Sequence, residues 1–145
     1  MPETRSNVWT LRCDGGARGN PGPGAYAYVL IDPRGQELES RGEYLGPVTN
    51  NVAEYRALIA GLGAAARHGA SNVRVCMDSE LVVRQMTGEY KVKNAGLKPL
   101  HAEAASAVTK LTRVTFRAVP REDNARADQL VNETLDKFLG SESPR

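Results

Sequence analysis

The fold is decided by residues 8–31, which read VWTLRCDGGARGNPGPGAYAYVLI. In residues 8–13 apolar and polar side chains alternate, a pattern typical of a half-buried strand. The segment that follows is dense in Gly, Pro and Asn, the residue types that form turns, and it leads into a second apolar run at 25–31. We therefore expect a hairpin-like start in which the first strand ends at Asp14 and the second begins at Ala25.

The chain beyond this hairpin alternates between helical and strand patterns. A polar segment after the turn at 32–35 predicts a third strand at the edge of the sheet. A helical pattern with Asn51 as its N-cap then leads into a fourth strand, and a strand-helix-strand crossover implies parallel pairing. The remaining pattern predicts two helices, a fifth strand and a last helix. The expected bounds are strands at 37–45, 72–77 and 114–119, helices at 51–68, 79–87, 100–111 and 124–139, and disordered tails at 1–7 and 140–145.

Length and composition exclude several classes of protein. The chain has 145 residues, of which 41% are hydrophobic and 25% charged, as expected for one globular α/β domain over residues 1–145. No run approaches ~20 apolar residues, and the first residues are not apolar, so we expect no membrane span and a cytoplasmic monomer. The net charge of +2 does not by itself indicate nucleic acid. Cys13 and Cys76 match no zinc spacing and are expected to be buried thiols.

Two carboxylates follow apolar strands. Asp14 and Asp78 each lie at the end of a predicted strand, the edge at which open α/β sheets place ligands. Two neighbouring carboxylates repel each other, and a hard divalent cation resolves that conflict. The structural alternative is that Asp14 belongs to a turn and that Asp78 caps the following helix.

Two further carboxylates lie on predicted helices. Glu54 shares a helical face with the small residues Ala57 and Gly61, which allow close approach to the sheet, but it also has the spacing of a capping box with Asn51. Asp128 borders the apolar stripe of the last helix, where it could instead compensate the helix dipole. From the residues alone, both readings stay open.

Four blocks of sequence resemble the type 1 ribonuclease H family. They span most of the chain in the family's order: residues 14–24 (DGGARGNPGPG), 49–54 (TNNVAE), 78–79 (DS) and 124–128 (NARAD). The resemblance implies a ribonuclease H-like five-stranded mixed sheet, three antiparallel strands followed by two parallel ones, flanked by helices. It also implies that the first and fourth strands are adjacent, which would bring Asp14 and Asp78 together.

The resemblance also implies a catalytic role. Asp14, Glu54, Asp78 and Asp128 would be metal ligands holding two Mg²⁺ ions, or Mn²⁺. Asp14 would be shared by both ions, Asp128 would hold the ion beside the attacking water, and the other two carboxylates would hold the ion at the leaving group. Two such ions activate water and stabilise the leaving oxygen in phosphodiester hydrolysis. The implied reaction cleaves the RNA strand of an RNA–DNA hybrid and leaves 5′-phosphate and 3′-hydroxyl ends.

Substrate contacts are implied for a further set of residues. Recognition of a hybrid requires contacts to 2′-hydroxyls and phosphates across a wide minor groove. Glycine backbone and asparagine amides suit close approach and hydrogen bonding, and a threonine and basic residues suit phosphate. The expected contacts are Gly15, Gly16, Arg18, Asn20, Thr49, Asn50, Asn51, Lys93, Asn94 and Asn124. The alternative for several of them is ordinary loop and capping chemistry.

The sequence departs from the family at three places. No inserted basic helix precedes Lys91, the loop before the last helix has no histidine, and Glu80 stands where relatives often carry Gln. Glu122 is a candidate substitute for that histidine. Two other functions also fit the sequence: a non-catalytic module that binds hybrid or double-stranded RNA, and a related nuclease that acts on DNA. A complete set of four carboxylates disfavours the first, because pure nucleic-acid binding favours positive charge.

Overall fold

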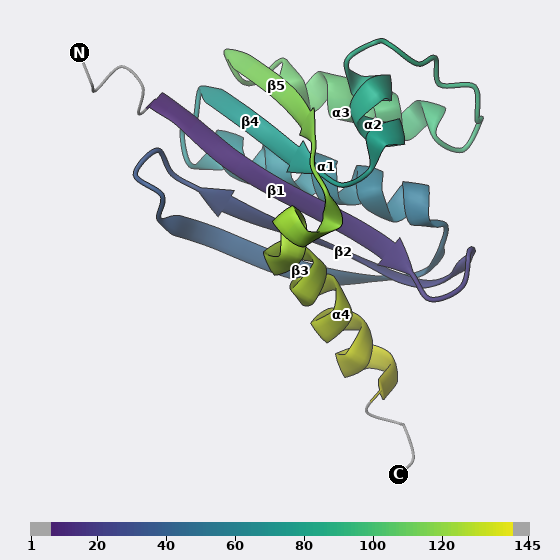
Figure 1. Ribbon diagram of the computed structural model, residues 1–145. Coiled ribbons are helices and arrows are strands. Elements are labelled where there is room, and N and C mark those ends of the chain that lie inside the picture. Colours follow the sequence, from purple (N-terminus) through teal and green to yellow (C-terminus); the bar gives the residue numbers. More distant parts are fainter. Residues whose placement is uncertain (1–6, 141–145) are drawn as a thin grey trace.

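Five strands form one sheet in the order β3-β2-β1-β4-β5 in the computed structural model, which describes residues 7–140 (Figure 1). The predicted tails therefore lie outside the described residues, except for Asn7 and Gly140. The strands are β1 (Val8–Ala17), β2 (Gly22–Ile31), β3 (Glu37–Val48), β4 (Asn72–Met77) and β5 (Arg113–Ala118). The helices are α1 (Asn50–Arg67), α2 (Glu80–Met86), α3 (Lys98–Val108), the short 3₁₀ helix η2 (Arg121–Asn124) and α4 (Ala125–Leu139).

The strand pairing confirms the predicted mixed sheet. β1 pairs antiparallel with β2, and β2 pairs antiparallel with β3, which lies at the edge of the sheet as expected. β4 pairs parallel with both β1 and β5. β1 is therefore the central strand, and β4 ends beside Cys13 of β1.

The first strand is longer than predicted. β1 continues past Asp14 because Gly15, Gly16 and Ala17 pair with residues of β2, which itself begins at Gly22. Glycine and alanine have low strand propensity, so the sequence indicated a turn here, but the hairpin partner supplies their backbone hydrogen bonds. Asp14 therefore lies within a paired strand, and the turn reading for it is wrong.

The start of α1 also differs from the prediction. The N-cap is Thr49, whose hydroxyl oxygen accepts a hydrogen bond from the amide of Val52 at 3.3 Å. Asn51 lies inside the first turn instead, so Glu54 is not at the spacing of a capping box and that alternative is wrong. Glu54 is thus free of a capping role.

Other element boundaries shift by one to three residues. The second helix is capped by the Ser79 hydroxyl rather than by Asp78, and α3 begins at Lys98, because a proline suits the first turn of a helix. β3 extends to Val48, β5 begins one residue earlier than predicted, and η2 precedes α4.

Helices cover both faces of the sheet. α1, α2 and α3 pack on one face and bury the main core, which includes Leu11, Tyr28, Tyr55 and Leu58. α4 packs on the other face against β2, β3 and β1, and Figure 1 shows it crossing in front of these strands. Both cysteines are buried and free, as predicted.

The sequence pattern predicts a buried stripe of Ala127, Leu130, Val131, Thr134 and Phe138 on the last helix, and of these the structure fully buries only Ala127 and Val131. Ala127, Val131 and Leu135 are buried against β2, whereas Phe138 is 50% exposed and stacks on Tyr44 of β3. The apolar stripe therefore reaches the end of α4 through Leu139, which packs against the same cluster, while Phe138 lies at its exposed edge. Backbone contact with the sheet is close because Gly42 of β3 lies against Thr134 of the helix.

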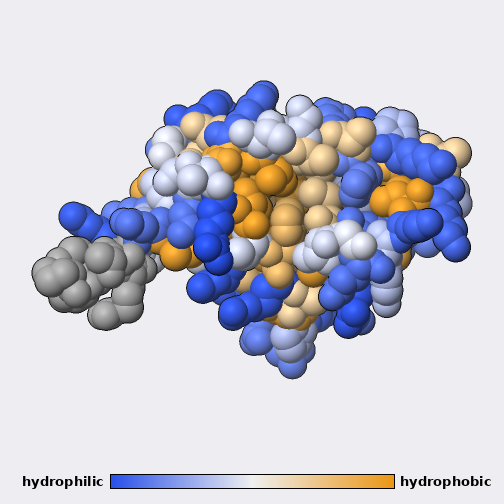
Figure 2. All heavy atoms as spheres, turned by 90° about the horizontal axis from the view of Figure 1, so that it is seen from above, coloured by the Kyte–Doolittle hydropathy of each residue, from blue (hydrophilic) through white to orange (hydrophobic). Residues whose placement is uncertain are grey.

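The surface carries only a limited apolar band on the face seen from above in Figure 2, and hydrophilic side chains border it. Partly buried hydrophobic residues that pack on the core include Val114 and Phe116 of the edge strand β5. In the part of the chain that the structure describes, none of the helices is long and apolar enough to cross a membrane.

Candidate active site

All four predicted carboxylates line one pocket of about 470 Å³ at the C-terminal ends of β1 and β4. Asp14 comes from β1, Glu54 from α1, Asp78 from the residue after β4, and Asp128 from the first turn of α4. Residues that are distant in the sequence are thus brought together by the sheet and by one helix from each of its faces.

The parallel register of β1 and β4 explains why two of the carboxylates are neighbours. Arg12 is paired with Cys76 across these strands. Side chains two residues further along point to the same face, so Asp14 and Asp78 follow side by side. Asp14 is only 6% exposed, and the Asp78 side chain is 15% exposed.

Close contact between β1 and α1 places Glu54. A Cβ atom added to Gly15 would lie 2.3 Å from the carbonyl carbon of Ala53 and 2.5 Å from the amide nitrogen of Glu54. Only glycine permits this approach of a strand to a helix backbone. Because Gly15 has no side chain, α1 can approach β1 closely enough to place Glu54 beside Asp14, in addition to any contact that Gly15 makes with a ligand.

Burial and repulsion raise the pKa values of two of the carboxyl groups. Burial is the main cause for Asp14, whose pKa is raised further by Asp78, by Asp128, which also forms a hydrogen bond with it, and by Glu54. Burial likewise raises the pKa of Glu54 to about 7; a hydrogen bond from Ser79 opposes the shift and the charge of Asp78 adds to it. Asp14 interacts with all three other carboxylates and is the centre of the cluster.

These shifts predict how stability without metal depends on pH. A group whose folded pKa is raised binds more protons in the folded state than in the unfolded one, so it destabilises the fold as pH rises through that range. We expect the free energy of unfolding in chelator to fall between about pH 5 and about pH 8, the range set by the raised pKa values of Asp14 and Glu54. Urea unfolding across this range measures it. A flat profile, or one that Glu54→Gln leaves unchanged, would contradict the assigned repulsion.

The carboxylates suit a hard divalent cation. Among residues 7–140 no three His, Cys, Asp or Glu side chains already stand as a closed metal-binding group. The four carboxylates instead line the wall of the shared pocket, so coordination requires them to turn toward its centre. An all-oxygen donor set is the kind that Mg²⁺ and Mn²⁺ prefer, and a cation would relieve the repulsion that raises the pKa of Asp14.

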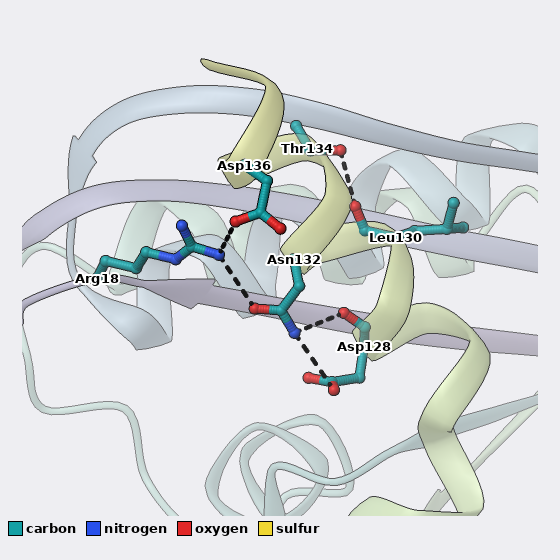
Figure 3. Close-up of polar contacts among 6 residues, drawn as sticks. All are labelled: Arg18, Asp128, Leu130, Asn132, Thr134 and Asp136. Atoms are coloured by element: carbon teal, nitrogen blue, oxygen red, sulfur yellow. Dashed lines mark hydrogen bonds and ion pairs between the residues drawn. The ribbon is translucent and has the colours of Figure 1, made fainter. Parts of the chain in front are cut away.

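A polar chain along α4 holds Asp128 in place (Figure 3). The amide nitrogen of Asn132 donates to the main-chain oxygen of Asp128 at 3.1 Å and to its carboxylate at 3.4 Å. Arg18, from the β1–β2 connection, forms an ion pair with Asp136 at 2.8 Å and contacts the Asn132 oxygen at 3.5 Å. Arg18 was predicted to contact phosphate; it lines the pocket while its guanidinium is held by α4.

We expect Asn132→Ala to weaken the reaction without unfolding the protein. Residues that orient metal ligands typically contribute about 10- to 100-fold to metal affinity or activity. The Mg²⁺ concentration needed for half-maximal activity should rise about tenfold, and stability should change little because Asn132 is exposed. The matched control is Glu133→Ala, one residue along the same helix. Equal behaviour of the two variants in a Mg²⁺ titration would show that Asn132 does not position Asp128.

Asn20 and Asn50 form hydrogen bonds that link the β1–β2 connection to the start of α1. Asn50 accepts a hydrogen bond from the Ala17 amide at 2.8 Å, and Asn20 accepts one from the Asn50 amide at 2.9 Å. These bonds use the side-chain oxygens of Asn20 and Asn50, so their side-chain amide nitrogens remain available to donate hydrogen bonds. Asn50 lines the pocket together with Gly15 and Gly16.

Other predicted contacts lie outside the pocket lining. Thr49 acts as the helix cap, and Asn94 accepts hydrogen bonds from Gly96 and Leu97 within its own loop. Asn51 and Lys93 are accessible but do not line this pocket. These residues remain predictions as contacts for an extended ligand.

The prediction of a substrate contact at Asn124 is wrong. Its side chain is fully buried and donates to the carbonyl of Cys13 at 2.8 Å, beside Asp14. Asn124 therefore ties the start of α4 to the central strand. The sequence showed a polar residue next to a carboxylate, but it did not show the burial.

Two polar residues of the pocket were missed by sequence reasoning. Arg121 of η2 lines the pocket, and its Nε lies 3.8 Å from the carboxylate of Asp78. Asn132 is the other; its spacing of four residues from Asp128 on a helix was the available signal. Glu122 is exposed and does not line the pocket. A basic residue thus occupies the loop in which relatives often carry histidine.

The acidic residue after Asp-Ser has a partner that the sequence analysis overlooked. Glu80 accepts two hydrogen bonds from the guanidinium of Arg84, at 2.8 and 3.0 Å, one helical turn further along α2. The pair neutralises the added negative charge near the pocket.

Comparison with known proteins gives matches over most of the chain. The sequence model of a family described as reverse transcriptase-like matches residues 12–134. A bifunctional protein of Mycobacterium tuberculosis is 44% identical over 127 residues, which are 87% of this chain and 35% of that protein. The chain thus spans about a third of the length of this relative.

Two further relatives match over nearly their whole length. A ribonuclease H of Hydrogenovibrio crunogenus is 33% identical, over 90% of this chain and 97% of its own. The structure of LC11 ribonuclease H1, isolated from compost and solved with an RNA/DNA hybrid, has a TM-score of 0.86 and 46% identity, covering 90% of this chain and 99% of that one. With the strand order and the shared carboxylate pocket, these matches establish that the chain belongs to the ribonuclease H family, type 1.

Proposed function

We propose that the protein hydrolyses the RNA strand of RNA–DNA hybrids, with divalent cations, and leaves 5′-phosphate and 3′-hydroxyl ends. The observation that carries the proposal is the one pocket that Asp14, Glu54, Asp78 and Asp128 all line, in a chain of this family. The relative solved with an RNA/DNA hybrid supports the substrate class.

The donor set supports two divalent cations, Mg²⁺ or, in its place, Mn²⁺. Bound there, such ions would activate a water molecule and stabilise the departing 3′ oxygen. Asp14 is the residue best placed to be shared between them, because the charges of all three other carboxylates raise its pKa. Asp128 comes from α4 on one face of the sheet, Glu54 comes from α1 on the other, and Asp78 directly follows β4.

The residues around the carboxylates bind and orient the substrate. The side-chain amide nitrogens of Asn20 and Asn50 offer donors beside the bare backbone of Gly15 and Gly16, where a sugar and its 2′-hydroxyl can approach closely. Arg121 brings a positive charge to the Asp78 side of the pocket and can meet a phosphate there.

Strand-specific labelling tests the proposal against both alternatives. Wild-type protein with Mg²⁺ is given a hybrid labelled on either strand, duplex DNA, duplex RNA and single-stranded RNA. Cleavage of the RNA strand of the hybrid, with 5′-phosphate and 3′-hydroxyl products, is expected. Binding of the hybrid without Mg²⁺-dependent cleavage would assign the protein to the non-catalytic class. Preferential cleavage of duplex DNA would make it a DNA nuclease.

A further inference from the structure

A group of arginines lies on the sheet face opposite the main core, on β1, β4 and β5. Because side chains alternate along a strand, residues next to core residues point to the other face. The register pairs Arg12 with Cys76 and Cys76 with Arg117, and two residues earlier it pairs Arg74 with Thr10 and with Thr115. We call Arg12, Arg74 and Arg117 the arginine face.

The arginine face lines a hollow of about 290 Å³. Thr10 and Cys76 also line it, and Cys76 is only 4% exposed, so its thiol forms part of the floor under the longer side chains. The hollow is therefore a polar depression with three guanidinium groups around it.

These arginines are not neutralised by carboxylates. In residues 7–140 neither Arg74 nor Arg117 forms an ion pair, and Arg12 donates only to the main-chain oxygen of Asp123, at 2.7 Å. Asp123 is the one acidic residue that lines the hollow. Elsewhere on the described surface most arginines are paired with acidic side chains, as are Arg18, Arg41, Arg67, Arg84 and Arg126. The arginine face therefore differs from most of the described arginines in having no carboxylate partner.

No helix packs over this part of the sheet in the described chain as α4 does over β2, β3 and β1. Figure 1 shows that α4 crosses β2 and β3, whereas β4 and β5 lie toward the other edge of the sheet. Arg117 is exposed, and Arg12 and Arg74 are partly exposed, so an external ligand can reach all three.

The arginine face is continuous with the candidate active site. Arg12 precedes Asp14 by two residues on the same face of β1, and η2 contributes to both hollows, Arg121 to the carboxylate pocket and Asp123 to the arginine-lined one. A polymer that passes the carboxylates can therefore run on past η2 onto the arginines.

Charge and spacing favour a phosphodiester backbone as the occupant. β1 and β5 are separated by two strand spacings, roughly 10 Å, and a nucleic-acid strand carries one charge per roughly 3.4 Å of its axis. Two or three neighbouring phosphates thus match the arginine face, and guanidinium groups bind phosphate oxygens in a bidentate manner. We infer that this face binds the sugar–phosphate backbone of the substrate where a strand extends beyond the carboxylate pocket. The inference rests on the proposed function for the identity of that substrate.

Binding measurements with and without an extension test the inference. The probes are a short blunt RNA–DNA hybrid and the same hybrid with a single-stranded extension at either end of the RNA strand, measured by fluorescence anisotropy in chelator over a salt series. The test variant is Arg74→Gln with Arg117→Gln. The matched control is Arg34→Gln with Lys110→Gln, which removes the same charge from the β2–β3 turn and from the second residue after α3.

The wild type should bind the hybrid with one of the two extensions more tightly than the blunt hybrid. The test variant should bind that extended hybrid about tenfold more weakly than the wild type does. Its slope of log affinity against log salt should fall by about 1.4, as expected for two lost contacts to a single strand. The control variant should keep the wild-type affinity for the extended hybrid and the wild-type salt slope. With Mg²⁺, the test variant should cleave the blunt hybrid at the wild-type rate.

Several results would overturn the inference. One is that neither extension raises the affinity of the wild type for the hybrid. A second is that the control variant loses as much affinity for the extended hybrid as the test variant does. A third is that the arginine face binds polyglutamate but not the extension, which would assign the face to an acidic protein partner. Failure of the wild type to cleave any hybrid would instead overturn the proposed function, and the anisotropy data would still report on the face itself.

Discussion

Replacing Asp14 with asparagine is expected to abolish Mg²⁺-dependent cleavage while the fold persists. Asp14 lies at the centre of the four carboxylates, and asparagine keeps its shape but supplies no negative charge to a cation. Losing several kcal/mol of transition-state stabilisation corresponds to a rate lower by about three orders of magnitude or more. The rate on a labelled hybrid under single-turnover conditions measures this loss.

The same substitution should stabilise the metal-free protein. At about pH 9 the buried Asp14 carboxyl is forced to ionise among like charges, so its removal should raise the free energy of unfolding by about 1–2 kcal/mol. The gain should shrink toward lower pH, where the carboxyl is protonated in the folded state. The control is Asp32→Asn, which keeps the oxygen that accepts from the amides of Arg34 and Gln36 and should behave as wild type in both assays. A cleaving Asp14→Asn protein would refute the role given to this residue.

Replacing Gly15 with alanine is expected to damage both stability and activity. The new methyl group would lie 2.3 Å from the backbone of Ala53, and a helix backbone cannot turn aside as a flexible side chain can. Overpacking of this kind costs about 3 kcal/mol, which lowers the melting temperature by roughly 6–12 °C in a chain of this size. Activity should fall further than stability alone explains, because α1 carries Glu54 away from Asp14.

Two other glycines, Gly16 and Gly63, provide the controls for this prediction. A Cβ atom on Gly16 would meet nothing closer than 3.9 Å, so Gly16→Ala should unfold at nearly the wild-type temperature. Gly63 of α1 has nothing within 4 Å, and Gly63→Ala should stabilise the helix by about 0.5–1 kcal/mol. If thermal unfolding of Gly15→Ala matched that of Gly16→Ala, the close packing of β1 on α1 would not be what fixes Glu54.

The sequence predicted the elements that its local pattern determines. Alternation marked β1, an apolar run marked β2, helical spacing marked α1, and the crossover between strands indicated parallel pairing. The convergence of Asp14 and Asp78 followed from strand ends and from the family resemblance. Each of these rests on short-range periodicity or on motifs several residues long.

What the sequence could not predict depends on long-range contact. Gly15 looked like a turn residue because its partner strand and the backbone of α1 are distant in the chain. Asn124 looked like a surface amide because its acceptor, the carbonyl of Cys13, lies on another strand. Phe138 fitted the apolar stripe of α4, yet it lies at the edge of the sheet, where it stacks on Tyr44 of β3 and stays half exposed.

The most direct test of the central claim compares the wild type with Asp78→Asn on a hybrid labelled in its RNA strand. Mg²⁺ is added first, and a chelator is added midway through the reaction. We predict that the wild type cleaves until the chelator stops it, that Asp32→Asn does the same, and that Asp78→Asn leaves the RNA intact. Full-rate cleavage by Asp78→Asn, or cleavage that continues in excess chelator, would contradict a cation-dependent reaction at these carboxylates.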